Sequence, residues 1–358
     1  MNKAPLRVLI ADDSATVRHF LASLIADTPD MTVVGEAKDG EEAILLAQRL
    51  HPDIISMDIS MPRLDGLAAT RYLMQHLPLP IVIVSAQLDK REDVDLAFMA
   101  LQAGALAVLD TPPGYQHAEF QTRRLHFLTT LRAMAGVTVV RRWFDTDPLT
   151  ADSRGTVELT PLPGALPGVV AIGASAGGPM ALHKVLNRLP SDFPVPVAIV
   201  QHMADGFVDG LIRWLDGCTP LAVTQAEQGQ LVRAGQVVVA GGGAHLTLRR
   251  AAGGGARVVL DYEFGSSPYL PSVDALFTSV ATHFGPRAVG VLLTGMGADG
   301  ADGLLKMREA GAHTIAQDEA TCLVYGMPGA AVARGAAMDV LPITQIVPAL
   351  LELVQEGV

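Results

Sequence analysis

A serine, a histidine and an aspartate in the second half of the chain have the residue types and spacing of a nucleophilic hydrolase. Ser175 lies in the run GASAG, between an apolar segment and a predicted helix. Such a turn lifts a serine hydroxyl out of a sheet and next to free backbone N–H groups. His202 and Asp299 each follow another apolar segment. Because the carboxyl ends of parallel strands meet at one edge of a sheet, we expect the three side chains to converge there.

The chemistry of such a set is acyl transfer through a covalent intermediate. We expect Ser175 to be the nucleophile, His202 the general base and Asp299 the group that orients the imidazole. The order serine, histidine, aspartate differs from the serine, aspartate, histidine order of the α/β-hydrolases.

The reaction also needs N–H donors for the oxyanion of the tetrahedral intermediate. Two glycine-rich turns, SAGGP and TGMGADG, are suited to supply them. We therefore predict that Ala176, Gly177 and Met296 support the oxyanion.

Other residues compete for some of these roles. His245 and His313 are weaker candidates for the base, and Asp302 is close in sequence to the expected aspartate. The run GASAGG could also be read as a dinucleotide-binding turn. That fingerprint requires glycine where Ser175 stands and an acidic residue after the next strand, where the chain has Gln201 and a histidine. The hydrolase interpretation is therefore favoured.

A second set of reactive side chains lies in the first half of the chain. Asp12 and Asp13 end a first apolar strand, Asp58 ends a third and Ser85 a fourth. In a right-handed parallel sheet the first and third strands are neighbours, so the three carboxylates should converge. Carboxylate oxygens suit Mg²⁺. With Mg²⁺ on Asp13 and Asp58, the latter could attack a phosphoryl group and form an acyl phosphate.

The first half alternates predicted strands and helices, which indicates a parallel, doubly wound α/β sheet of the flavodoxin-like kind. The expected strands cover residues 7–11, 31–37, 53–57, 81–85 and 106–109. The expected helices cover residues 15–26, 41–50, 67–76 and 92–102, and a last one starts near residue 119.

Two domains and a linker account for the length of 358 residues. We predict an N-terminal domain over 1–125, a linker over 126–166 and a C-terminal α/β domain with a mostly parallel sheet over 167–358. The segment 145–168 has Pro, Gly, Thr and Asp without periodicity, which is typical of a linker. Apolar runs at 237–239 and 258–260 flank a glycine-rich stretch and suggest a β-hairpin.

Charge and cysteine content restrict the class of protein. A net charge of −11 argues against nucleic-acid or membrane-surface binding. Only two cysteines are present, so a disulfide scaffold is excluded and a reducing compartment is favoured. No segment has the ~20 apolar residues of a membrane span. We expect a cytoplasmic protein without direct membrane insertion.

The first half resembles response-regulator receiver domains in the runs IADDS, MDISMPRLDG and IVIVSA. The resemblance implies that Asp58 is the phosphoacceptor and that a chemotaxis histidine kinase donates the phosphoryl group. It also implies that Ser85 is the hydroxyl that moves to the phosphate. Mg²⁺ would be held by Asp12, Asp13, Asp58 and the Ser60 carbonyl.

The whole chain resembles the CheB-type protein-glutamate methylesterase family. The shared runs are IGASAGGP, VQHM, PSVDALF, VLLTGMGADGADGLLKMREAGA, IAQDEATC and YGMPGAA. The resemblance implies hydrolysis of glutamyl methyl esters on cytoplasmic helices of methylated chemoreceptors, with deamidation of glutamine at similar sites. It places the triad on Ser175, His202 and Asp299 and implies no cofactor for the esterase. It also implies that the receiver blocks the esterase cleft until it is phosphorylated.

Two departures from these families keep alternatives open. Thr111 stands where receivers carry the lysine that pairs with the phosphate, which predicts weaker coupling between phosphorylation and the conformational change. Residues 266–270 read SSPYL, where basic residues are usual. One alternative is therefore a hydrolase of another protein ester or amide in a parallel chemosensory system. Another is a non-enzymatic phosphate sink.

Overall fold

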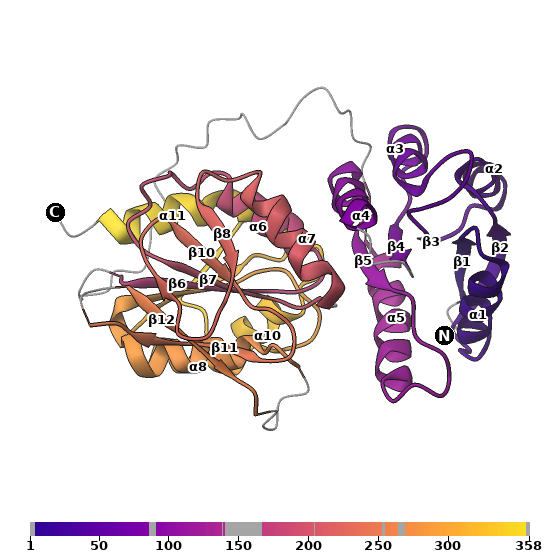
Figure 1. Cartoon of the computed structure of the whole chain (residues 1–358). Coiled ribbons are helices and arrows are strands. Elements are labelled where there is room, and N and C mark those ends of the chain that lie inside the picture. The colour runs from indigo at the N-terminus through magenta and orange to yellow at the C-terminus, as the bar shows by residue number, and fades with distance from the viewer. Residues whose placement is uncertain are drawn as a thin grey trace. The chain divides into compact units, whose positions relative to one another are not determined.

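The structure is a computed structural model of the chain, and it describes residues 4–85, 91–137, 139, 167–203, 205–252, 255–263 and 269–355. The chain folds as two compact units, Met1–Pro148 and Leu149–Val358 (Figure 1). Both units are built of a parallel sheet with helices packed on it, as the alternating pattern of the sequence predicts.

The first unit contains a five-stranded parallel sheet in the order β2-β1-β3-β4-β5. This order confirms that the first and third strands are neighbours. The strands are β1 (Leu6–Ala11), β2 (Met31–Ala37), β3 (Ile54–Met57), β4 (Ile81–Ser85) and β5 (Ala107–Asp110). The helices are α1 (Ala15–Ala26), α2 (Gly40–Leu50), α3 (Gly66–His76), α4 (Arg91–Ala103) and α5 (Phe120–Ala135).

The last helix of the first unit is longer than the expected domain boundary allows. Helix α5 continues to Ala135, so the beginning of the expected linker, 126–166, is helical. Phe127, Leu128, Leu131 and Met134 are buried on it, at the spacing of one helix face. Most of the remaining expected linker, residues 138 and 140–166, lies outside the described residues.

The second unit is built on a seven-stranded sheet in the order β15-β14-β13-β6-β7-β10-β8, and all of its strand pairs are parallel. Its strands are β6 (Val169–Ala174), β7 (Val197–Gln201), β8 (Ala222–Gln225), β10 (Gln236–Val239), β13 (Ala288–Leu292), β14 (His313–Gln317) and β15 (Asp339–Leu341). Its α-helices are α6 (Gly178–Leu186), α7 (Asp205–Asp216), α8 (Val273–Phe284), α9 (Ala301–Glu309), α10 (Met327–Ala333) and α11 (Ile343–Gln355). In Figure 1, α6, α7 and α11 lie on one side of this sheet, and α8 and α10 on the other.

A smaller antiparallel sheet corrects one expectation. Its order is β11-β12-β9, from His245–Arg250, Ala256–Asp261 and Leu231–Val232. The hairpin is therefore formed by β11 and β12, whereas the run 237–239 is β10 and joins the parallel sheet. The first arm was not recognised because its sequence, HLTLRR, has only two apolar residues, separated by a threonine, and forms no apolar run.

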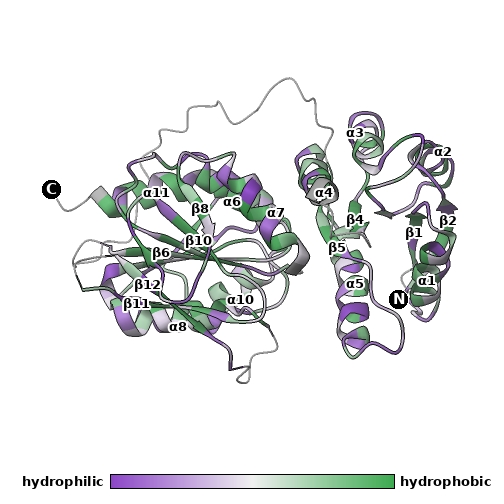
Figure 2. Cartoon of the chain, in the orientation of Figure 1, coloured by the Kyte–Doolittle hydropathy of each residue, from purple (hydrophilic) through white to green (hydrophobic). Residues whose placement is uncertain are grey.

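The strand order places the three expected hydrolase residues together. Strand β6 lies between β13 and β7, so the carboxyl ends of all three are adjacent. Residues Val169–Ala174 are all buried, as a central strand covered on both faces requires. Figure 2 shows hydrophobic residues along the strands, while α5 and α8 also carry hydrophilic ones. Among the described residues, no helix is long and apolar enough to cross a membrane.

Candidate functional site

Ser175 lies on a tight turn between β6 and α6. Its N–H donates to the Thr294 carbonyl (3.0 Å), and its carbonyl accepts from the Gly178 N–H (2.8 Å). Gly177, at φ +77°, allows this turn because a side chain is strained in that region. A Cβ there would also lie only 2.6 Å from the Leu323 Cβ. The turn therefore places the serine at the carboxyl end of the central strand, as predicted.

His202 follows β7 and is hydrogen-bonded to Asp299. The two residues approach through His202 Nε2 and Asp299 Oδ2 at 2.8 Å. The backbone N–H of His202 also donates to the Ala174 carbonyl (2.9 Å). This bond connects the residue expected to act as the base to β6, the strand that precedes the nucleophile. With Nε2 used by the carboxylate, Nδ1 is the ring nitrogen left to exchange a proton. Within the described structure, the Ser175 hydroxyl has no hydrogen bond to this ring. Such bonds are often long without substrate.

The Asp299 carboxylate accepts hydrogen bonds from groups at the N-terminus of helix α8. Its Oδ1 accepts from the Ser272 hydroxyl (2.8 Å) and the Asp274 N–H (3.2 Å), and its Oδ2 accepts from the Val273 N–H (2.7 Å). Burial opposes ionisation, but the bond and charge of His202 and these donors outweigh it and lower the pKa of Asp299. The positive end of the helix dipole acts in the same direction. Asp299 is therefore held as an anion facing the imidazole.

Ser272 was not among the predicted site residues. It caps α8 through a hydrogen bond from the Ala275 N–H to its hydroxyl, and the same hydroxyl donates to Asp299. A serine directly before an apolar periodic run is a recognisable N-cap signal. Its second bond depends on the packing of α8 against the turn after β13, which no local pattern shows.

The competing residues have other partners. His245 is buried, and its Nδ1 accepts from the backbone N–H of Ser272, the N-cap of α8 (3.1 Å). His313 Nε2 lies 2.6 Å from Asp339 Oδ2 between two neighbouring strands. Asp302 is exposed and forms an ion pair with Arg334 (2.8 Å). None of these contacts connects to the nucleophile turn, so the geometry favours His202 and Asp299 over them.

The expected oxyanion donors belong to two glycine-rich turns, one containing the nucleophile and one following β13. Within the described part of the chain, the N–H groups of Ala176, Gly177 and Met296 donate no hydrogen bond. The Thr294 hydroxyl donates to the Ala176 carbonyl (2.9 Å) and so links the two glycine-rich turns. A Cβ on Gly295 would lie 2.8 Å from the Ser175 Cβ, which shows how closely the second turn passes the serine. Their role as oxyanion donors remains a prediction.

Gln201 is a further residue that the sequence reasoning did not identify. Its Nε2 donates to the carbonyls of Ser175 (2.9 Å) and His202 (2.8 Å). One buried carboxamide thus joins the backbone of the nucleophile to that of the base. A glutamine at the end of an otherwise apolar strand was the available signal, because a buried polar group needs partners.

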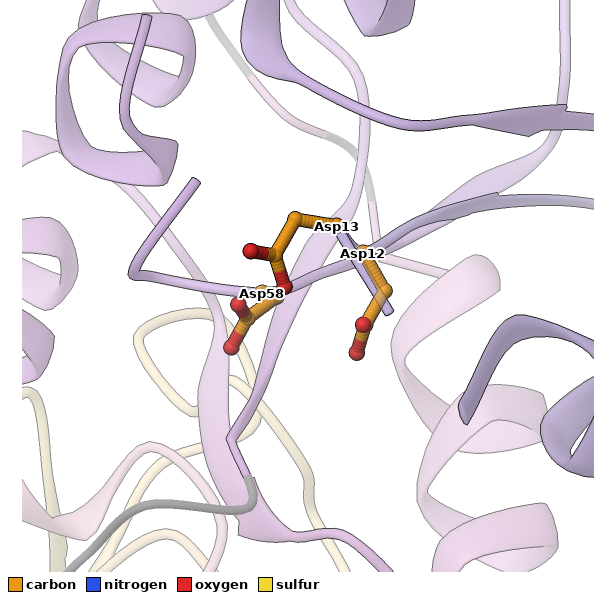
Figure 3. Close-up of side chains that lie close together, drawn as sticks. All are labelled: Asp12, Asp13 and Asp58. Atoms are coloured by element: carbon orange, nitrogen blue, oxygen red, sulfur yellow. The ribbon is translucent and has the colours of Figure 1, made fainter. Parts of the chain in front are cut away.

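The acidic side chains of the first unit converge as predicted (Figure 3). Asp12, Asp13 and Asp58 each offer a carboxylate oxygen, and these oxygens lie within 4.8 Å of one another. Burial, then the charges of Asp12 and Asp13, raise the pKa of Asp58 to about 7. Burial and the Asp13 charge likewise raise the pKa of Asp12 to about 6, although the Ser14 N–H opposes this. A divalent cation would offset this crowding of negative charge, so the donor set fits Mg²⁺.

The remaining predicted residues of this unit lie on the same edge of the sheet. Ser85 is buried at the end of β4, and its carbonyl accepts from the Thr111 N–H (3.0 Å) just after β5. Within the described residues, the buried Thr111 hydroxyl has no hydrogen-bond partner. Ser60 follows Asp58 in the next loop, and its N–H bonds the Asp58 carboxylate. Its carbonyl as a metal ligand remains a prediction.

Comparison with protein families assigns both units. The model of the response regulator receiver domain matches residues 8–115, and that of the CheB methylesterase matches residues 170–350. Both matches fall inside the compact units found in the structure.

Relatives match the chain over nearly its full length. The protein-glutamate methylesterase/protein-glutamine glutaminase 4 of Myxococcus xanthus is 43% identical over 97% of this chain and 96% of its own. A protein of the same name from Geobacter metallireducens is 44% identical over 98% of this chain and 99% of its own. The CheB methylesterase catalytic domain of Thermotoga maritima matches with TM-score 0.51 and 38% identity. That match covers 53% of this chain and all of the Thermotoga chain.

Proposed function

The chain belongs to the CheB methylesterase family, and from this premise we propose that it hydrolyses glutamyl methyl esters on chemoreceptors under control of its receiver domain. Glutamine deamidation at similar sites belongs to the same proposal, because both reactions expel a small leaving group from a γ-carbonyl. The substrates would be the cytoplasmic helices of methylated receptors, and the enzyme would act in the cytoplasm.

One observation supports the esterase above all. The His202–Asp299 hydrogen bond of 2.8 Å stands at the end of the strand beside that of Ser175, with the carboxylate held ionised by α8. A serine that is free on a tight turn, a base beside it and a fixed carboxylate are the parts of a nucleophilic ester hydrolase.

The proposed reaction has two steps. In the first, the Ser175 Oγ attacks the ester carbonyl carbon and its proton moves to His202. Collapse of the tetrahedral intermediate breaks the bond to the methoxy oxygen, which leaves as methanol with the proton from His202. In the second, water gives a proton to His202 and attacks the acyl carbon. The bond from that carbon to Ser175 Oγ then breaks, Oγ takes the proton back from His202, and the receptor side chain is left as glutamate. The carboxylate of Asp299 stabilises the imidazolium in both steps.

The oxyanion of both intermediates would accept hydrogen bonds from the N–H groups of Ala176, Gly177 and Met296. For a glutamine substrate the same sequence applies with ammonia as the leaving group, so no additional residue is required.

In the receiver, we assign phosphoryl acceptance to Asp58. A carboxylate oxygen of Asp58 would bond to phosphorus as the donor leaves, with a chemotaxis histidine kinase as the donor. Bound Mg²⁺ would supply positive charge against the carboxylates and the incoming phosphoryl group. The Ser85 hydroxyl would then move to the phosphate, beside Thr111. The Mg²⁺ ligands in this proposal are Asp12, Asp13, Asp58 and the Ser60 carbonyl.

Methanol release from membranes that contain methylated receptors tests the proposal. It is measured with and without acetyl phosphate and Mg²⁺, and the Ser175→Ala variant serves as blank. Release that increases with acetyl phosphate supports both the esterase activity and its control by the receiver. If acetyl phosphate does not change the release, the proposed esterase activity is supported and the proposed control by the receiver is contradicted. No release from the parent protein would contradict the proposed substrate and favour another protein ester, or a phosphate sink if other esters also fail.

A further inference from the structure

The proposed base is covered on one face by an aromatic ring. The Tyr269 ring lies parallel to the His202 imidazole, with the ring centroids 4.7 Å apart and an angle of 6° between their planes. Tyr269 comes from the segment just before α8, the helix that also holds the carboxylate of Asp299. Tyr269 is exposed at 37%, so part of the residue remains open to solvent. The imidazole is thus contacted at its edge by Asp299 and on its face by Tyr269.

Tyr269 also reaches the second glycine-rich turn. A Cβ on Gly297 would lie 2.9 Å from the tyrosine Oη, so the phenol passes directly over this glycine. Gly297 has φ +88° and directly follows Met296, a proposed oxyanion donor. The ring therefore extends from the base to the turn expected to bind the oxyanion, and it forms one side of the reaction centre.

A hydrogen bond at one ring nitrogen does not by itself fix the plane of an imidazole. Asp299 fixes the position of Nε2, but a change in the χ2 torsion of His202 can still tilt the ring plane. Nδ1 must point to the serine within a narrow angle for proton transfer. A parallel ring in van der Waals contact resists this tilt, because tilting breaks the stacked contact. It would also favour the imidazolium formed during the reaction, since an aromatic face attracts a cation.

We propose that Tyr269 is a positioning residue of the esterase, whose stacked ring holds the His202 imidazole in the plane required for proton transfer from Ser175. This inference rests on the proposed function. The ring and not the hydroxyl carries the effect, so phenylalanine should replace tyrosine and an aliphatic residue of similar size should not.

Three variants of the full-length chain test the proposal. Tyr269→Phe keeps the ring, Tyr269→Leu removes it, and Tyr262→Leu changes a tyrosine that is 64% exposed, as the matched control. Each is assayed for methanol release from receptor membranes and for hydrolysis of p-nitrophenyl acetate. For Tyr269→Leu we expect kcat to fall about three- to tenfold with KM for the small ester nearly unchanged. The other two variants should retain the parent kcat.

A proton NMR measurement reports the stacking directly. The Cε1 proton of His202, assigned by its loss in His202→Gln, should move downfield in Tyr269→Leu because the ring current is removed. It should stay in place in Tyr269→Phe and Tyr262→Leu. Thermal unfolding of each variant checks that the folded state is retained.

Several results would overturn the inference. These are an unchanged kcat in Tyr269→Leu, an equal loss in Tyr269→Phe, or a His202 resonance that does not respond to loss of the ring. Failure of the proposed function is distinguishable from these. In that case the parent protein would release no methanol, while the small-ester kcat and the NMR shift would still decide the role of Tyr269.

Discussion

At the residue scale, the Asp299 carboxylate accepts from the imidazole, a hydroxyl and two backbone N–H groups. An amide in its place would turn an NH₂ group toward some of these donors and lose the charge that stabilises the imidazolium. For Asp299→Asn we expect kcat for methanol release to fall on the order of 10²- to 10⁴-fold. Asp302→Asn is the matched control, because its exposed pair with Arg334 contributes little. A damaging Asp302→Asn beside a silent Asp299→Asn would show that the third member is wrongly assigned.

Replacing Thr111 by lysine should strengthen the response of the receiver to phosphorylation. The Thr111 hydroxyl is buried without a hydrogen-bond partner within the described residues, and it lies next to the end of β4. In Thr111→Lys an ammonium group would be able to pair with the phosphoryl group on Asp58. The ratio of methanol release with and without acetyl phosphate should therefore increase. Thr111→Met, of similar length but uncharged, should not increase it. If this ratio is the same in the parent and in the lysine variant, another group of the parent protein already pairs with the phosphoryl group.

At the element scale, the first turn of α8 performs two tasks through Ser272. The hydroxyl caps the helix and also holds Asp299, so Ser272→Ala should lower both stability and rate. We expect a loss of about 1 kcal/mol in unfolding free energy and a two- to tenfold decrease in kcat, roughly the effect of one hydrogen bond.

Ser279 on the same helix provides the control for this prediction. Its hydroxyl donates to the Leu276 carbonyl and accepts from the Leu248 N–H, away from the reaction centre. Ser279→Ala should therefore lower stability while the rate is retained. If both variants lose rate in proportion to stability, the role of Ser272 is structural only.

The same helix terminus predicts a pH dependence of stability. The pKa of Asp299 is lower in the folded state than its ordinary value of 3.8. The carboxylate then contributes stability that is present above pH 3.8 and is lost as the pH falls through the folded-state pKa. Urea unfolding of the second unit in the parent and in Asp299→Asn should show a difference that is largest near neutral pH and narrows below about pH 4. A difference that stays constant down to pH 2 would contradict the assigned shift.

The observed strands and helices show which parts of the fold and of the candidate site could be predicted from the sequence. Apolar runs with glycine-rich turns predicted the parallel strands, and the end-of-strand positions of Ser175, His202 and Asp299 followed from them. The hairpin was assigned to the wrong first strand because β11, HLTLRR, has only two apolar residues and therefore shows no apolar run. Gln201 and Tyr269 were missed for a different reason. Their contacts join segments far apart in the chain, and only the packed structure brings these together.

At the scale of the whole molecule, two compact units with separate chemistry share one chain. The acidic cluster lies entirely in the first unit, and the His202–Asp299 pair lies entirely in the second. A change confined to one site should therefore affect the other only through regulation, and kinetic measurements on the full chain can separate the two.

The Asp58→Asn variant tests whether the two sites are separate, because it changes only the acidic cluster of the first unit. The amide has nearly the shape of the carboxylate but cannot form an acyl phosphate, and it removes one of three crowded acidic groups. We therefore expect acetyl phosphate with Mg²⁺ to give no increase in methanol release, while basal release stays within about twofold of the parent rate. Ser175→Ala supplies the complementary case, with no release under either condition. If basal release also fell in Asp58→Asn while thermal unfolding was unchanged, the unphosphorylated receiver would itself support the esterase. If stimulation survived, the donor would be acting at a residue other than Asp58.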